Sequence, residues 1–167
     1  NGRAACAAGS GHAAQFLAFF TLLEPGDHFV ASRNLYGGSI TQFGVSFKKL
    51  GWHCTFADPL EPETFRKALK SSSKAIFIES VSNPSSVIGD IEAIAEISHA
   101  EGIPLIVDNT MASPYLFNPI DYGADIVIHS TTKYLNGHGN SMGGVVVESG
   151  QFDWAQNNKF PSMTTPD

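Results

Sequence analysis

Charge is scarce in this sequence, and so are the features of several protein classes. Only 16% of the 167 residues are charged, the ten Lys and Arg residues are scattered, and the formal net charge is −6. A protein that binds nucleic acid carries a basic stripe that neutralises phosphates, so no nucleic acid is expected as a partner. No apolar run approaches the ~20 residues that a bilayer-spanning helix needs, so no membrane is expected either.

Cysteine is equally scarce, with only Cys6 and Cys54. Both lie in apolar stretches, which predicts two free, buried thiols and a cytoplasmic location. None of the six histidines is spaced as His-x-x-x-His or lies beside paired cysteines, so the sequence predicts no metal site. It also lacks the Gly-x-Ser-x-Gly elbow of hydrolases and a phosphate loop that ends in Gly-Lys-Ser/Thr.

Short apolar runs alternate with helical patterns along the chain. With 43% hydrophobic residues, the chain can bury one substantial core. Runs rich in β-branched and aromatic residues are expected to form strands covered on both faces, at residues 29–31, 53–57, 75–78, 105–107, 126–128 and 145–147. Helical spacing at 65–69 and 91–99 lies between them. The alternation predicts an α/β fold, with a mostly parallel, doubly wound sheet and helices on both faces.

Polar residues follow several of the expected strands. In a parallel sheet, ligands bind beyond the carboxyl ends of the strands. The side chains at these ends are Ser32-Arg33-Asn34, Glu79-Ser80, Asp108-Asn109-Thr110 and His129-Ser130. We therefore expect a site at this edge of the sheet.

A glycine turn, Gly9-Ser10-Gly11-His12, runs directly into an expected helix. The first amides of a helix have no intrahelical partners, so they can hold a phosphate. A tight turn that only starts a helix is the simpler interpretation. Gly9-x-Gly11-x-x-Ala14 also matches a dinucleotide-binding fingerprint, for which Arg33 would suit an NADP phosphate, although residues 4–8 are a poor copy of the buried strand that this fingerprint requires.

Lys133 comes shortly after the apolar run 126–128. A lysine at such a place either extends to solvent or is a desolvated amine that attacks aldehydes. Ser130 and Thr132, at alternate positions, can point together toward one phosphate. A polar loop with a surface lysine is the alternative interpretation.

Asp108 ends an expected central strand, and Tyr36 precedes two glycines and another expected helix. A carboxylate at a strand end can cap a helix, or it can hold the charged ring nitrogen of a cofactor such as pyridoxal phosphate (PLP). Tyr36 can stack on such a ring, or it can simply fill the core.

Five motifs, in this order and at these separations, resemble the Cys/Met metabolism family of PLP-dependent enzymes. They are Ser10-Gly11, Tyr36-Gly37-Gly38, Glu79-Ser80-Val81-Ser82-Asn83-Pro84, Val107-Asp108-Asn109-Thr110 and Ser130-Thr131-Thr132-Lys133-Tyr134. The resemblance implies the large domain of a fold-type I, aspartate aminotransferase-like enzyme. It also implies that residues 1–167 are an incomplete PLP-binding domain, without its N-terminal arm and C-terminal small domain.

The resemblance assigns roles to individual residues. Lys133 would form the Schiff base with PLP and move protons, and Asp108 would pair with the ring nitrogen. Tyr36 would stack on the ring and assist proton transfer, and Asn83 would lie beside the phenolic oxygen and the substrate carboxylate. The remaining cofactor-binding residues would hold the phosphate: Ser10, the amides of Gly11 and His12, and the hydroxyls of Ser130 and Thr132. His12 stands where the family usually has Met or Gln.

The C-terminal part resembles the O-acetylhomoserine sulfhydrylase branch of the family, in residues 113–116, 136–141, 148–154, 159–161 and 165–166. This implies a γ-replacement that converts O-acetyl-L-homoserine and sulfide to homocysteine and acetate in methionine biosynthesis. Cystathionine γ-synthase and methionine γ-lyase reactions are the alternatives, because they share every residue named. The aromatic residues of this segment could instead be a hydrophobic cluster under a long loop.

The family resemblance also implies a partner. The enzyme would be a homo-oligomer, a dimer of dimers, whose active site is shared between subunits. A Tyr-x-Arg phosphate contact from the neighbouring subunit and a carboxylate-binding Arg from the C-terminal domain do not occur in this chain. We therefore expect these 167 residues alone to bind PLP weakly and to turn over nothing.

Overall fold

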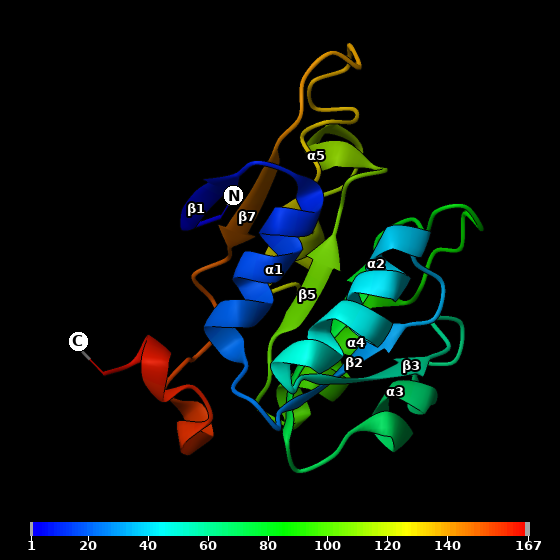
Figure 1. Ribbon diagram of the computed structural model, residues 1–167. Helices are drawn as coiled ribbons and strands as arrows, with labels where there is room; N and C mark the ends of the chain where they lie inside the picture. The colour runs from blue at the N-terminus through cyan, green and yellow to red at the C-terminus, as the bar shows by residue number, and fades with distance from the viewer. Residues whose placement is uncertain (1, 166–167) are drawn as a thin grey trace.

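The strands of residues 2–165, the part of the chain that the computed structural model describes, form one sheet in the order β1-β7-β6-β5-β4-β2-β3. Their bounds are β1 Ala4–Ala8, β2 His28–Ser32, β3 His53–Ala57, β4 Ser73–Glu79, β5 Leu105–Asp108, β6 Ile126–His129 and β7 Gly144–Glu148. Strand β7 runs antiparallel to both of its neighbours, and the other pairs are parallel. The predicted mostly parallel sheet is confirmed, and Figure 1 shows β1 and β3 at its opposite edges.

The helices connect the strands as the alternating pattern predicts. They are α1 Gly11–Leu22, α2 Gly37–Thr41, α3 Glu63–Ala68, α4 Ile91–Ala100 and α5 Ser113–Leu116. Helix α2 continues through a π-helical turn, Gln42–Ser46, and a 3-10 turn, Phe47–Leu50, and further 3-10 turns lie at Pro119–Tyr122, Gln156–Asn158 and Pro161–Met163. Within residues 2–165, no helix has both the length and the apolar character that a membrane crossing requires.

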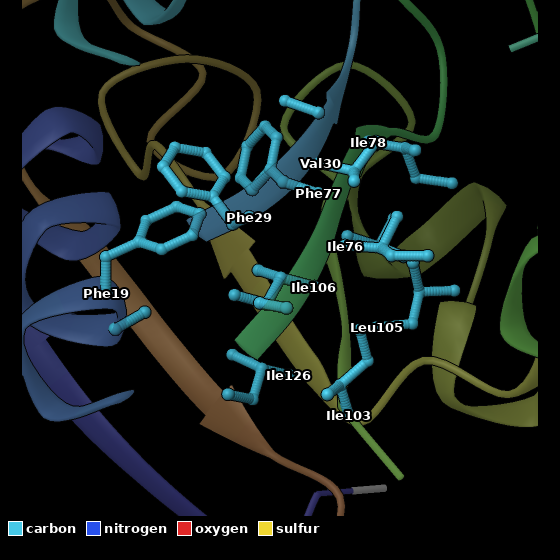
Figure 2. Packing of buried hydrophobic residues seen from close by; sticks show 14 of the residues in the cluster. Phe19, Phe29, Val30, Ile76, Phe77, Ile78, Ile103, Leu105, Ile106 and Ile126 are labelled. Carbon is cyan, nitrogen blue, oxygen red and sulfur yellow. The ribbon is translucent and has the colours of Figure 1, made fainter. Parts of the chain in front are cut away.

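Two hydrophobic layers cover the sheet, one on each face. On one face, Phe19 of α1 packs against Phe29 and Phe77, at ring-centroid distances of 4.4 Å and 5.9 Å. Because side chains alternate along a strand, Ile76 and Ile78 point to the opposite face, which Figure 2 shows. All five side chains are fully buried. The packing fixes the strands, and with them the positions of the residues that follow the strands.

The edges of the sheet differ from the expectation. Residues Ala4–Ala8, which make a poor buried strand, form an exposed edge strand that pairs with β7. Main-chain hydrogen bonds alone hold such a strand, so large side chains are not required. Strand β3 also lies at an edge and is only partly buried, so the expectation that it is covered on both faces was wrong. Because β1 is not a buried parallel strand, the structure gives no support to the dinucleotide-binding alternative.

The two cysteines have different surroundings. Both are free, but Cys6 lies on β1 and is exposed, so its predicted burial was wrong. Cys54 on β3 is partly buried, and burial raises the pKa of its thiol to about 12. A thiol with so high a pKa stays protonated and unreactive.

The C-terminal segment contains an aromatic cluster of Phe152, Trp154 and Phe160. The ring centroids of Phe152 and Trp154 are 4.7 Å apart, those of Trp154 and Phe160 are 5.4 Å apart, and Phe160 is buried. This is the hydrophobic cluster that the sequence offers as one interpretation of the segment. Pro166, which belongs to the motif at 165–166, lies outside the described residues.

Candidate active site

A cavity of about 830 Å³ lies where β4, β5 and β6 end and α1 begins. All nine residues predicted to bind the cofactor line it, namely Ser10, Gly11, His12, Tyr36, Asn83, Asp108, Ser130, Thr132 and Lys133. They come from five separate segments of the chain, so only the fold brings them together. The volume is within the usual range for a pocket that binds a cofactor or small ligand.

The first turn of α1 forms one wall of the cavity. The Ser10 hydroxyl oxygen accepts a hydrogen bond from the amide of Ala13, which makes Ser10 the N-cap. The amides of Gly11 and His12 are the first of the helix and have no intrahelical partners. A Cβ atom on Gly11 would lie 2.7 Å from Cβ of Ser130, so glycine is what allows the helix to approach the end of β6. The arrangement suits an anion.

Ser130 and Thr132 lie on the loop that follows β6. The amide of Ser130 donates to the hydroxyl oxygen of Thr110 at 2.8 Å. The Thr132 hydroxyl accepts from the amide of Gly143 at 3.1 Å and donates to its carbonyl at 3.2 Å. These bonds hold the loop against two other segments, and both hydroxyl side chains line the cavity beside the start of α1.

Lys133 lies on the same loop and is exposed to the cavity. Its amide donates to the carbonyl of Ser130 at 3.2 Å, which places it one turn after the end of β6. Within residues 2–165, its side-chain amine takes part in no salt bridge. The amine is therefore free to react with a ligand in the cavity.

Asp108, the last residue of β5, is a buried carboxylate that also lines the cavity. Its Oδ1 accepts hydrogen bonds from the amide and the hydroxyl of Thr110, and its Oδ2 accepts one from the side chain of Gln15. Burial raises the pKa of Asp108, although the bonds from Thr110 and Gln15 act in the opposite direction. A buried carboxylate with this balance is suited to a cationic partner.

Gln15 is a site residue that the sequence did not reveal. It lies one turn into α1 and is buried, and its Nε2 donates to Ser39 at 3.0 Å and to Asp108 at 3.2 Å. A glutamine in a helix usually lies on the protein surface, so its residue type does not indicate a buried site residue. Its spacing of four residues from Gly11 is the only signal, because positions i and i+4 share a helix face.

Tyr36, just before α2, presents its ring to the cavity and is about half exposed. The ring stacks with that of His12 at a centroid distance of 5.7 Å and an interplanar angle of 29°. A Cβ atom on Gly38 would lie 2.5 Å from both rings, so Gly38 leaves the space that the pair occupies. His12 is thus accommodated beside Tyr36, at the position where the resemblance implies Met or Gln.

Glu79 is a second residue to which the sequence assigned no role beyond its place at a strand end. Its carboxylate accepts from the amide of Tyr36 at 2.8 Å and from the amide of Asn83 at 2.9 Å. The pKa of Glu79 is raised to about 7, chiefly by burial and also by the charge of Asp108, while the two amide bonds act in the opposite direction. Asn83 lines the cavity on the loop after β4.

The residues around the cavity fit PLP. The free amides of α1 suit a phosphate, and the buried Asp108, whose pKa is raised by burial, suits a protonated ring nitrogen. The ring of Tyr36 offers an aromatic surface, and the amine of Lys133 can bind an aldehyde. Within residues 2–165, no three His, Cys, Asp or Glu side chains gather as a metal site.

Comparison with known proteins identifies the family. Residues 1–165 match the family model of the Cys/Met metabolism PLP-dependent enzymes. The chain is 45% identical over 166 residues to the O-acetyl-L-homoserine sulfhydrylase of Leptospira meyeri and 45% identical over 168 residues to the homocysteine synthase of Schizosaccharomyces pombe. These alignments cover 99% of this chain, but only 37% and 39% of the two relatives.

A crystal structure from Campylobacter jejuni has the same fold. It superimposes with a TM-score of 0.96 and 34% identity, covers 99% of this chain and 41% of its own, and contains N'-pyridoxyl-lysine-5'-monophosphate. The chain thus spans about two fifths of the length of the proteins that it matches. The match along nearly every residue, the fold and the shared identity show that this chain belongs to the Cys/Met metabolism family of PLP-dependent enzymes.

Proposed function

We propose that this chain holds PLP in the cavity at the ends of β4, β5 and β6, with Lys133 as the residue that binds the cofactor's aldehyde. The observation that carries the proposal is the meeting of all nine predicted residues around one cavity. When bound, PLP supplies an electron sink for negative charge that develops on the substrate. Family membership supports this assignment, because PLP is the cofactor of the family.

The chain's own residues would divide the work. The amides of Gly11 and His12 and the hydroxyls of Ser10, Ser130 and Thr132 would hold the phosphate. Asp108 would keep a positive charge on the ring nitrogen, because a carboxylate buried beside a cation stabilises that cation.

Proton transfer would fall to Lys133. Its amine would act as a base from a short loop, which the hydrogen bonds between Thr132 and Gly143 hold in place. Tyr36 would cover the face of the ring and assist the transfer. Asn83, on the loop after β4, would contact the substrate carboxylate.

The reaction that we propose is the γ-replacement of acetate by sulfide on O-acetyl-L-homoserine, which gives L-homocysteine for methionine biosynthesis. The support is the pair of relatives named O-acetyl-L-homoserine sulfhydrylase and homocysteine synthase, each 45% identical over 99% of this chain. A product assay with sulfide, cysteine and methionine tests it. Homocysteine from sulfide is the expected product, whereas cystathionine or methanethiol would instead identify a γ-synthase or a γ-lyase.

We also propose that a second copy of the chain completes the site, as in a dimer of dimers. Neither Arg3, Arg33 nor Arg66 lines the cavity, whose lining contains two carboxylates, Glu79 and Asp108. A phosphate and a substrate carboxylate need more positive charge than Lys133 offers. Sedimentation of the natural protein at its full length tests the assembly. We also propose that the protein is located in the cytoplasm.

Borohydride reduction followed by peptide mapping tests the cofactor assignment. Reduction fixes PLP to the amine that holds it, so label on the peptide that contains Lys133 is expected. Label on another lysine, or none, would overturn the assignment.

A further inference from the structure

Glu79 lies between two loops that form separate walls of the cavity. Its Oε1 accepts from the amide of Tyr36, which precedes α2, and its Oε2 accepts from the amide of Asn83, which follows β4. The two amides are 47 residues apart in sequence, so no local turn brings them together. One carboxylate therefore connects the loop that carries the aromatic ring to the loop that carries the amide side chain.

A second bond joins the same two loops farther from the cavity. The side-chain amide of Asn34 donates to the hydroxyl of Ser85 at 3.2 Å, and both groups are at the exposed side of the loops. Neither Asn34 nor Ser85 lines the cavity. Glu79 is thus the connection at the cavity itself, and its side chain is buried.

We propose that Glu79 is a positioning residue, whose carboxylate bridges the amides of Tyr36 and Asn83 and thereby fixes both side chains against the bound cofactor. This inference rests on the proposed function, because Tyr36 and Asn83 act there on PLP and the substrate. Glu79 itself needs no contact with either ligand. Its part is to set the distance between two walls of the cavity.

The bridge depends on a side chain with two acceptor oxygens. Glutamine has the same length but only one acceptor, so its NH₂ group would face one of the two amides, donor against donor. Aspartate is one methylene shorter and cannot reach both. A carboxylate that merely filled space would be replaced by glutamine with little consequence, which separates the two explanations.

Acid should weaken the bridge, because a protonated carboxyl is a poorer acceptor for two amides. The pKa of Glu79 is already raised to about 7, chiefly by burial, with a smaller contribution from the charge of Asp108 on β5. The other basic side chains that line the cavity are His12 on α1 and Lys133 on the loop after β6. Loosening of both loops is therefore expected near neutral pH in the protein without cofactor.

Amide hydrogen exchange tests the bridge in the apoprotein, prepared as the natural protein at its full length. In Glu79→Gln, one of the two amides, that of Tyr36 or that of Asn83, should exchange roughly ten- to a hundredfold faster, as expected for a lost bond to a charged acceptor. Glu79→Ala should release both amides, whereas Glu79→Gln should release mainly one. In the wild type, protection of the two amides should fall as the pH drops from 8 to 6, and Glu79→Gln should lack this dependence.

Glu96→Gln is the matched control, because Glu96 is an exposed carboxylate on α4. The bridge is overturned if Tyr36 and Asn83 are as protected in Glu79→Gln as in this control. Cofactor titration supplies the second readout, since Glu79→Gln should bind PLP roughly tenfold more weakly from misplacement of its contacts. Equal PLP affinity in the two variants would overturn the positioning role.

The exchange experiment is done without the cofactor, so failure of the positioning role can be distinguished from failure of the proposed function. Absence of borohydride label at Lys133 in the wild type would reject the cofactor assignment alone. Melting temperatures of the variants show that a change in exchange is local rather than global. If exchange rises uniformly across the β4 peptides in both Glu79→Gln and the control Glu96→Gln, the bridge is overturned.

Discussion

Gln15, one turn into α1, donates from Nε2 to Oδ2 of Asp108 at 3.2 Å, and both residues are buried. The bond favours the ionised form of Asp108, against the burial that raises the pKa of this carboxyl. The same Nε2 donates to Ser39, so α1 and α2 both contribute to the surroundings of Asp108. The charge on Asp108 thus depends on a residue that is remote in sequence.

Replacing Gln15 with leucine should weaken PLP binding about tenfold, because the lost bond raises the pKa of Asp108 further. Asp108 would then be less ionised and would hold the ring nitrogen less firmly. The visible absorption of the bound cofactor, titrated in the natural protein, gives the affinity. Gln151→Leu, at an exposed position, is the control, and equal affinities would contradict the role of Gln15.

Removing the amine of Lys133 should abolish turnover while the cofactor still binds through its phosphate and ring. The loss in rate for a general base is typically a hundred- to ten-thousandfold, and loss of the covalent link adds to it. Lys133→Ala is measured in the natural protein at its full length, by product formation and by borohydride labelling, with Lys67→Ala, at an exposed position on α3, as the control. Covalent label that persists in Lys133→Ala would reject the assignment.

The sequence predicted the strands whose side chains form the core. Phe29, Ile76 and Ile126 are aromatic or β-branched residues, as strands favour, and each is buried in the core. Residue type therefore predicted the strand and its burial correctly at these positions. The edge strand at Ala4–Ala8 was missed, because its main-chain bonds to β7 leave no mark on the side chains.

Some residues of the candidate site could likewise be predicted from the sequence, and others could not. Lys133, Asp108 and the glycine turn follow strands or begin a helix, so one stretch of sequence is enough to notice each of them. Gln15 and Glu79 act through partners in other segments, Asp108 and the amides of Tyr36 and Asn83. Such pairings exist only once the sheet has formed, so the roles of Gln15 and Glu79 could not be predicted from the sequence.

Adding a methyl group at Gly11 should separate α1 from the end of β6. The new Cβ would lie 2.7 Å from Cβ and 3.1 Å from Cα of Ser130, and the backbone contact cannot be relieved by a rotamer change. We expect Gly11→Ala to destabilise the protein by about 1–3 kcal/mol, the usual result of overpacking, and to weaken phosphate binding. Gly9→Ala is the control, since nothing lies within 4 Å of a Cβ there, and equal melting temperatures would contradict the close approach.

His99 on α4 should make the stability of the protein dependent on pH. Its Nε2 is 2.8 Å from Oδ2 of Asp125, and this hydrogen bond, with the charge of Asp125, raises the pKa of His99 although burial acts against it. Because the folded pKa is above the unfolded value of about 6.5, the stabilisation is complete below that value. It disappears as the pH rises through the folded pKa.

The imidazole is 42% exposed, so solvent screening limits the effect to less than about 1 kcal/mol. Chemical denaturation of the wild type and of His99→Gln at pH 5.5 and at pH 8.5 measures it. The two proteins should differ more at pH 5.5, and 1 M salt should reduce that difference, because it screens charges at this degree of exposure. Asp125 also accepts the amide of Leu105, so Asp125→Asn should be more damaging than His99→Gln at both pH values. A difference between wild type and His99→Gln that is the same at both pH values would mean that the ion pair does not contribute to stability.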